Sequence, residues 1–457
     1  MIQEQLLEIG FQQQLEAVTG IKENNVLTLQ GLKENFAKAL EIGVNRQNKK
    51  MIGNDGGLMV IDTGIAPLKV EDMDWLKPGS VCFVCAAGGT NWEMGIMKVV
   101  ESGLTEYGHL QTLKMRDFTR DEAGRLKQYS ASRISKLIGE KVSIVLQEAQ
   151  IDPAWIDTLA IALGFAQDNQ RVSYGVEARL NSDSSCKDWQ FVPEEGEQPF
   201  IGQGVIRFLT ETTKERWRAE TVAIGNDTNQ TANDLTAILN NALDESGVEM
   251  LNMGLVAGTG NNICIGRFNL ESGNWLISSD PALKIMHQLG RLTTDYDIVE
   301  YKTGGKCLID RLGAAVLLMG KAGLLNGPYQ QAAEQIFKAK GEELSHIAKG
   351  EIKFEAFSQE DMSKIQLTAR MILREAADLI AVMALAAAEA AGYDAARGKK
   401  GLVLAEGSVL WKGYGVQDKV ETVIRNLGGN LGFIKANGLI GAGLQALVEY
   451  GKRYIIK

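Results

Sequence analysis

The sequence contains 457 residues, which is enough for two or three domains with sizeable hydrophobic cores. Hydrophobic residues make up 45% and charged residues 23% of the chain, as in ordinary globular proteins. The net charge of −9, from 48 Lys and Arg against 57 Asp and Glu, argues against a nucleic-acid binder, because such proteins usually present a basic face.

The apolar residues of the N-terminal stretch recur at helical spacing, so residues 1–46 are predicted to form two helices. Glycine and proline turns favour an extended segment over 51–79. Further along, helices are expected over 115–150, 231–243, 283–290, 307–325, 365–392, 417–427 and 438–451, strands over 157–165, 222–224 and 401–405, and a loop over a cleft at 181–203. This alternation predicts an α/β protein.

Two stretches, 81–99 and 253–266, share the plan strand, glycine turn, strand, which argues against a purely parallel sheet. Their turns hold Gly88, Gly89, Thr90 and Asn91 in the first stretch, and Gly258, Thr259 and Gly260 in the second. Because glycine lacks a Cβ, the backbone N–H groups of such a turn can approach a phosphate closely. A lone Gly-Thr-Gly is usually a plain hairpin turn, but the repetition suggests an internal duplication and a polyphosphate held between two hairpins.

Five cysteines are scattered along the chain, at positions 82, 85, 186, 264 and 307. Cys82 and Cys85 lie in a predicted strand, which favours a buried apolar role over zinc or redox chemistry. The three histidines form no metal-like cluster. Charges such as Arg374 and Asp378 interrupt the alanine-rich segment 365–392, which favours a buried helix over a membrane span. Without a secretory leader, a reducing, cytoplasmic setting is expected.

In their order along the chain, these motifs resemble those of the hexokinase family, over about residues 50 to 450. Residues 86–91 are similar to the family's first phosphate hairpin, Asp-x-Gly-Gly-Thr-Asn, and Asn226-Asp227-Thr228 to its catalytic Asn-Asp-Thr. Residues 258–262 are similar to its second hairpin, Gly-Thr-Gly-x-Asn. Residues 278–280 are similar to the family's Asn-Thr-Glu. Residues 303–306 are similar to its Asn-Pro-Gly-Lys, and Asp310-Arg311 to the Glu-Lys that follows. Glu406-Gly407-Ser408 is similar to its adenosine segment, Asp-Gly-Ser.

The resemblance implies an actin-like architecture, with two related ribonuclease-H-like α/β domains and a cleft between them. The small domain would span about 71–222, and a C-terminal helix at about 445–457 would return to it. The large domain would hold 1–70 and 223–444, with the catalytic Asp and much of the nucleotide site.

The activity that the resemblance implies is transfer of the γ-phosphate of ATP, bound with Mg²⁺, to the 6-hydroxyl of glucose or a related hexose. Asp227 would be the general base, although its position before a helix is also typical of an N-cap. The implied sugar ligands are Asn226, Asn262, Asp280 and Asp310, and the implied ATP ligands are Gly88, Gly89, Thr90, Asn91, Gly258, Thr259, Gly260, Gly407 and Ser408. No metal ligand, nucleic-acid partner or membrane partner is predicted from the protein side chains.

Alone, Asp280 is also typical of a turn before Pro281, and Asp310 of a solvated helix residue. Both stand where the family has glutamate, so the charge is kept and the reach is shorter. Three departures are larger. Ala86 replaces the aspartate that helps to hold Mg²⁺, the family's sugar stretch diverges after Leu163-Gly164-Phe165, and the Trp-Thr-Lys stretch at Trp189 lacks its lysine, for which Lys187 is a possible substitute.

These departures leave two alternatives open beside the kinase. One is a catalytically weak sugar- or nucleotide-binding regulator of the hexokinase fold. The other is a chaperone-like ATPase of the same superfold, against which Asn226 and Asn262 count.

Overall fold

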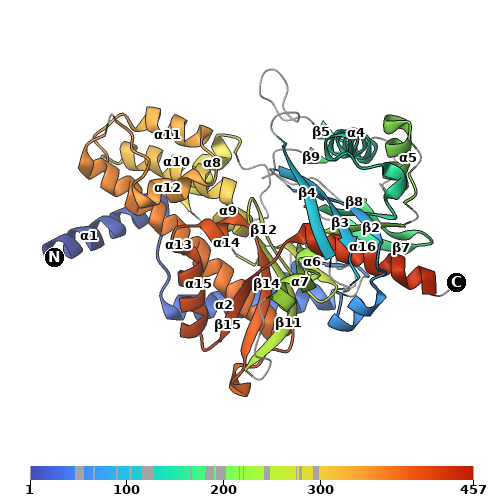
Figure 1. The fold of residues 1–457 in the computed structure, drawn as a ribbon. Coiled ribbons are helices and arrows are strands. Elements are labelled where there is room, and N and C mark those ends of the chain that lie inside the picture. Colours follow the sequence, from blue (N-terminus) through green and yellow to red (C-terminus); the bar gives the residue numbers. More distant parts are fainter. Residues whose placement is uncertain are drawn as a thin grey trace.

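Two separate β-sheets divide the chain into two lobes, which lie on the right and the left of Figure 1. This computed structural model describes residues 2–46, 56–64, 67–88, 91–101, 105–115, 128–164, 167–180, 190–191, 202–215, 217–219, 221–240, 247–273, 275–276, 280–291, 298–355 and 357–455. Everything stated below about the structure refers to these residues.

The sheet of the first lobe has the strand order β4-β3-β2-β6-β10-β8-β7. Strands β2, β3 and β4 run antiparallel, whereas β6 and β10 continue from β2 in parallel. The strands are β2 (Val81–Ala87), β3 (Asn91–Val99), β4 (Thr105–Lys114), β6 (Thr158–Leu163), β7 (Gln167–Val172), β8 (Gly175–Leu180) and β10 (Thr221–Asn226).

The sheet of the second lobe has the order β1-β13-β12-β11-β14-β15. Its strands are β1 (Leu58–Asp62), β11 (Val248–Ala257), β12 (Asn261–Ile265), β13 (Phe268–Gly273), β14 (Lys400–Glu406) and β15 (Leu431–Lys435). Here β11, β12 and β13 are antiparallel, and β14 and β15 continue from β11 in parallel. Five strands of each sheet therefore follow one plan, and the two glycine hairpins, β2–β3 and β11–β12, occupy equivalent places, as the suggested duplication requires.

Helices cover both faces of the first sheet. Helices α4 (Ala131–Ala149) and α5 (Gly202–Thr213) pack with the core that includes Phe83 and Cys85. The opposite face, with Cys82 and Val84, is covered by α16 (Gly438–Ile455). Successive residues of a strand point to opposite faces, which explains how one apolar strand supplies both cores.

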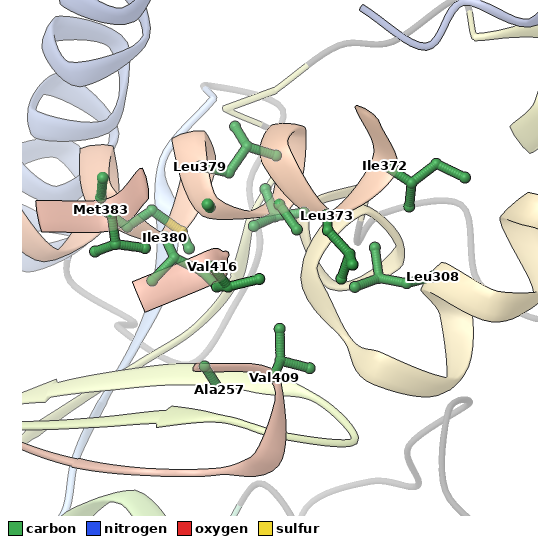
Figure 2. Close-up of a cluster of buried hydrophobic side chains, with 14 of the residues drawn as sticks. Ala257, Leu308, Ile372, Leu373, Leu379, Ile380, Met383, Val409 and Val416 are labelled. Carbon is green, nitrogen blue, oxygen red and sulfur yellow. The ribbon is translucent and has the colours of Figure 1, made fainter. Parts of the chain in front are cut away.

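The second lobe is built around α13 (Gln359–Ala390), whose N-cap Ser358 accepts a hydrogen bond from Asp361 N. Figure 2 shows Leu373 of this helix facing Leu308, and Ile380 facing Val416, with Val409 and Ala257 beneath. Ala257 directly precedes the second glycine turn, and Val409 directly follows Ser408. The core therefore reaches up to both predicted ATP-binding segments of this lobe.

The remaining helices lie mostly in the second lobe (Figure 1): α1 (Ile2–Thr19), α2 (Val26–Asn45), α6 (Asp227–Ala232), α7 (Leu235–Asn240), α8 (Pro281–Gln288), α9 (Ile298–Thr303), α10 (Gly305–Lys321), α11 (Tyr329–Lys338), α12 (Glu343–Lys349), α14 (Ser408–Lys412) and α15 (Val416–Asn426). The short strands β5 (Gln128–Tyr129) and β9 (Gln190–Phe191) pair with each other. Single 3₁₀ turns occupy Val70–Trp75, Pro153–Trp155 and Ala395–Arg397.

The two lobes exchange helices. Strand β10 of the first sheet leads directly into α6, which packs on β11, since a Cβ on Gly254 would come within 2.5 Å of Thr228 O. Conversely, α16 follows β15 of the second sheet and covers the first. The two helices cross in close contact at Gly441, where a Cβ atom would clash with the Gln230 carbonyl oxygen.

Most predicted elements are confirmed, including the two N-terminal helices and both hairpins. Two predictions of helix were too long. The segment 231–243 is broken between α6 and α7, and 115–150 is helical only from Ala131 among the residues described. Of the predicted loop 181–203, the described residues are not loop: Gln190–Phe191 form β9, and α5 begins at Gly202. The rest of that segment, with Cys186, lies outside the described residues, and the domain limits stay a prediction. Cys82, Cys85, Cys264 and Cys307 are buried free thiols, and no helix in the described ranges is long and apolar enough to cross a membrane.

Candidate active site

Asp227 lies at the connection between β10 of the first sheet and α6, the helix that packs on the second sheet. Strand β10 ends at Asn226, and α6 begins at Asp227. The N-cap is Asn226, whose Oδ1 accepts from Thr228 N at 3.0 Å, so an N-cap role for Asp227 is wrong by one residue. The half-buried Asp227 accepts from the same N–H at 2.8 Å through Oδ1.

Asn262 lies on the face of the second sheet that α6 covers. It is two residues before Cys264 on β12, so the two side chains share a face. Cys264 Sγ lies 3.5 Å from Thr228 O, and the negative charge of Asp227 adds to the burial that raises the pKa of this thiol to about 12. The structure therefore brings Asn226, Asp227 and Asn262 to the beginning of α6.

The second glycine turn lies against the predicted adenosine segment. Gly258 N donates to Gly260 O at 2.8 Å, which closes the turn. Gly407 has φ +110°, and a Cβ there would come within 2.2 Å of Ala257 O, so only glycine fits. A Cβ on Gly258 would in turn lie 3.4 Å from Gly407 Cα. Ser408 begins α14 beside this contact and is exposed.

The N-terminus of α10 borders the same turn. Gly305 N donates to Gly258 O at 2.8 Å, and a Cβ on Gly304 would come within 2.6 Å of Thr259 O. Gly304 supplies no side-chain cap, and the partial positive charge of a helix N-terminus favours an anion nearby. These contacts place the N-terminus of α10 directly beside the second glycine turn.

Asn261 is a polar residue of this site to which sequence reasoning gave no role. Its side-chain oxygen and nitrogen are both buried and have no hydrogen-bond partner in the described part of the chain. Buried carboxamides are normally hydrogen-bonded, so this residue is suited to a ligand or a bound water. The sequence feature that could have identified Asn261 is its position directly after Gly258-Thr259-Gly260.

The first glycine turn is described only in part. Gly88 N donates to Asn91 O at 3.1 Å, and Asn91 is exposed. Gly89 and Thr90 lie outside the described residues, as do Phe165, Lys187 and Trp189. Of the altered sugar stretches of the first lobe, Gln167–Asn169 begin β7 and Gln190–Phe191 form β9.

The Glu406 carboxylate lies at the start of α16 and experiences the negative charges of two other carboxylates. Glu406 ends β14, and its Oε2 accepts from Gly438 N at 2.7 Å and from Thr231 Oγ1 at 3.0 Å. Burial, with the negative charges of Asp227 and Glu93, raises the pKa of Glu406 to about 7. Burial also raises the pKa of Glu93. Sequence reasoning gave no role to Glu93 and treated Glu406 only as part of a turn.

Asp280 has a different set of partners from the other predicted sugar ligands. It is 4% exposed, and its Oδ1 caps α8 by accepting from Ala282 N at 2.9 Å. Its Oδ2 lies 2.5 Å from an Arg311 nitrogen, and Arg311 and Lys302 both pair with Glu375, at 2.7 and 2.6 Å. Asp280 is thus one of four buried charges that join α8, α9, α10 and α13.

Asp310 is likewise engaged by protein groups. Its Oδ1 accepts from Arg291 and Lys306, each at 3.0 Å, and Arg291 also lies over the Phe337 ring at 4.2 Å. At 6% exposed, Asp310 is a helix residue as predicted but is not solvated. In this structure the protein itself satisfies the carboxylates of Asp280 and Asp310.

A small polar pocket lies beside Asn226, with Asn169, Asn229 and Gln230 in its walls. The side-chain oxygens of Asn169 and Asn229 are buried without a hydrogen-bond partner in the part of the chain described. Its volume of about 10 Å³ is that of a site for one water molecule. The pocket therefore suits a water that bridges these carboxamides, not a hexose.

No protein-family model matches this sequence, and no curated protein matches it. Solved structures do match. A hexokinase from Schistosoma mansoni complexed with glucose superimposes with a TM-score of 0.67 at 12% identity, covering 96% of this chain and 99% of that one. A second hexokinase crystal structure gives a TM-score of 0.67 at 13% identity with the same coverage. The chain therefore has the two-lobed α/β fold of the hexokinases over nearly its whole length.

Proposed function

We propose that this chain is an ATP-dependent hexose kinase, with Asp227 as the general base. The 6-hydroxyl oxygen of glucose or a related hexose forms a bond to the γ-phosphorus of ATP, and the bond from that phosphorus to the β–γ bridging oxygen breaks. ADP leaves with the electron pair of the broken bond. The hydroxyl proton passes to the Asp227 carboxylate and then to solvent.

The position of Asp227 is the observation that carries this proposal. It lies at the connection between the two sheets, directly after Asn226, and Asn262 lies on the face of the second sheet that α6 covers. A base needs hydrogen-bond reach to the proton that it takes, and a half-buried carboxylate at the meeting of two lobes has that access. Carboxamides beside it can donate to and accept from sugar hydroxyls.

Sugar binding by Asp280 or Asp310 would be energetically unfavourable, because both carboxylates already have protein partners. To bind sugar, Asp280 would have to give up Arg311 or the cap of α8, and Asp310 would have to share Lys306 or Arg291. Breaking a buried ion pair is strongly unfavourable. We therefore assign the primary sugar contacts to Asn226 and Asn262, and secondary ones to the two aspartates.

The nucleotide would lie along the second turn. In this proposal Thr259, Gly260 and the N-terminus of α10 would border the phosphates, and Gly407 and Ser408 would border the adenosine, because these segments lie against one another. When bound with ATP, Mg²⁺ would neutralise phosphate charge during transfer. Glu93 fits this ion, because its carboxylate has no protein partner among the described residues and carboxylate oxygen is a ligand that Mg²⁺ prefers. In the described ranges no three such side chains lie close enough to hold a metal alone, so the phosphates would supply further ligands.

The direct test is the variant Asp227→Asn. It keeps an oxygen for the bond from Thr228 N and removes only the basic group. Turnover of ATP with hexose should fall by about 10²- to 10⁴-fold, the usual contribution of a general base, while the unfolding midpoint stays unchanged. Unchanged turnover would end the assignment of Asp227.

The substrate class is tested by measuring ADP release from Mg-ATP with a panel of hexoses, with amino sugars and without sugar. Release that depends on glucose or a related hexose supports the kinase. Two observations favour the alternative of a catalytically weak regulator: Ala86 lacks a carboxylate, and Asp280 and Asp310 are held by the protein. Sugar binding without sugar-dependent release would support that reading, and release without any sugar would support an ATPase.

A further inference from the structure

Ala86, where the resemblance expects an aspartate, faces Glu93 across the first hairpin. In the antiparallel pairing of β2 with β3, Ala86 and Glu93 are direct partners. Directly opposed residues of an antiparallel pair project from the same face, with Cβ atoms about 4.5–5.5 Å apart. Ala86 packs with the core beneath α16, so the Glu93 side chain projects on the α16 face.

Among the described residues, the Glu93 carboxylate has no counter-charge. No hydrogen bond or ion pair to it is found among the described residues, although the residue is half-buried. Burying part of an unpaired carboxylate is energetically unfavourable, and another negative charge nearby makes the burial more unfavourable still. Its charge acts on Glu406, which also experiences that of Asp227.

The same space has to accept a polyphosphate if the proposed function holds. Glu93 is two residues beyond Asn91 at the first turn, and Glu406 directly precedes Gly407 at the adenosine segment. A triphosphate would add several negative charges beside three carboxylates. A divalent cation between the phosphates and a carboxylate is the arrangement that removes this repulsion.

From this geometry we propose that Glu93, projecting from β3, holds the nucleotide-bound Mg²⁺ in place of a carboxylate at position 86 on β2. The inference rests on the proposed nucleotide site. Glutamate is one methylene longer than aspartate, which offsets part of the displacement of the carboxylate to the neighbouring strand. The relocated residue therefore keeps a carboxylate on the same sheet face beside the same turn.

The test is the affinity for ADP, measured by calorimetry with and without Mg²⁺, in the wild type and in Glu93→Gln, Ala86→Asp and Ala86→Asp/Glu93→Gln. In the wild type Mg²⁺ should strengthen ADP binding. Glu93→Gln should lose about tenfold of that enhancement, with affinity for metal-free ADP unchanged or higher because one repelling charge is removed. The double variant should regain the enhancement, because a carboxylate is restored on the same face.

Glu101→Gln is the matched control. It removes one charge just beyond the other end of β3, from an exposed residue, and should leave the Mg²⁺ enhancement intact. Equal enhancement in the wild type and in Glu93→Gln would overturn the role of Glu93 and leave the proposed function standing. Absence of ADP binding to the wild type under all conditions would overturn the proposed function, and this inference with it.

Discussion

The fold strongly alters the ionisation of the Glu406 carboxyl group. Its usual pKa is 4.5, and burial together with the charges of Asp227 and Glu93 raises it to about 7. The folded protein therefore holds a proton on this carboxyl more tightly than the unfolded chain does. Protonated Glu406 could donate to Thr231, which in turn lies 3.0 Å from Asp227 O.

This shift predicts a pH-dependent stability with a definite sign. Between about pH 4.5 and pH 7 the folded state binds more protons at Glu406, so its contribution to the free energy of unfolding falls as pH rises and is constant above that window. Glu406→Gln, which has no proton to lose, should remove this slope. Urea unfolding of both proteins at several pH values, without nucleotide or Mg²⁺, measures it, and identical slopes would contradict the shift.

The sequence singled out some residues of the site and missed the importance of others. The predicted catalytic segment and both turns are read from contiguous motifs, and their assignment as site residues stays a prediction. Glu93 was missed because its significance depends on its register opposite Ala86. The engagement of Asp280 was missed because Arg311 and Glu375 are distant in sequence.

At the scale of elements, a buried charge network joins four helices. Asp280 on the N-terminal side of α8, Lys302 of α9, Arg311 of α10 and Glu375 of α13 are all nearly or completely buried. Arg311 is fully buried between two carboxylates, which keep it charged. Such a network fixes the positions of the helices at the back of the second turn, because each charge needs its partners.

Asp280→Asn separates this structural role from a sugar-binding one. Asparagine caps a helix as well as aspartate does, so the cap of α8 remains and only the charge is lost. We expect the free energy of unfolding to fall by about 3 kcal/mol, because Arg311 loses a buried counter-charge. Asp394→Asn, which changes an exposed N-cap, should be nearly neutral. A raised KM for hexose with unchanged stability would instead assign Asp280 to the sugar.

Element boundaries were predicted well where the pattern is long and local. The alanine-rich segment 365–392 lies within α13 except for its last two residues, and the strand predicted at 401–405 lies within β14. The helix predicted over 231–243 failed because Asn233 and Asp234 use their side chains in tertiary hydrogen bonds to Leu68 N and Asn437 N. Those partners belong to other parts of the fold and leave no local trace.

At the scale of the whole molecule, the exchange of α6 and α16 couples the lobes. The helices cross at Gly441, whose Cβ position is blocked by the Gln230 backbone, and Gln230 is three residues beyond Asp227. Gln230 also donates to Gln445 of α16 at 2.6 Å. A change at this crossing therefore acts on the placement of the proposed base.

Gly441→Ala should weaken this coupling. The added methyl group meets backbone atoms that cannot move aside cheaply, so we expect a loss of about 1–3 kcal/mol in the free energy of unfolding and a lower turnover. The matched control is Gly31→Ala in α2, where nothing lies within 4 Å of the new Cβ and alanine should be neutral or stabilising by up to about 1 kcal/mol. Equal effects of the two substitutions in a denaturant titration would count against a tight crossing.

The return of α16 to the first sheet also bears on how the chain is made. Ribosomes deliver a protein from its N-terminus, and domains generally fold as units when their residues have emerged. All strands of the first sheet are present once Asn226 has been added, yet the face with Cys82, Val84 and Met97 lacks the cover of α16 until that helix is synthesised. The nascent first lobe must therefore wait with an apolar face open, and a chaperone that shields such surfaces would act on it throughout the synthesis of the second lobe.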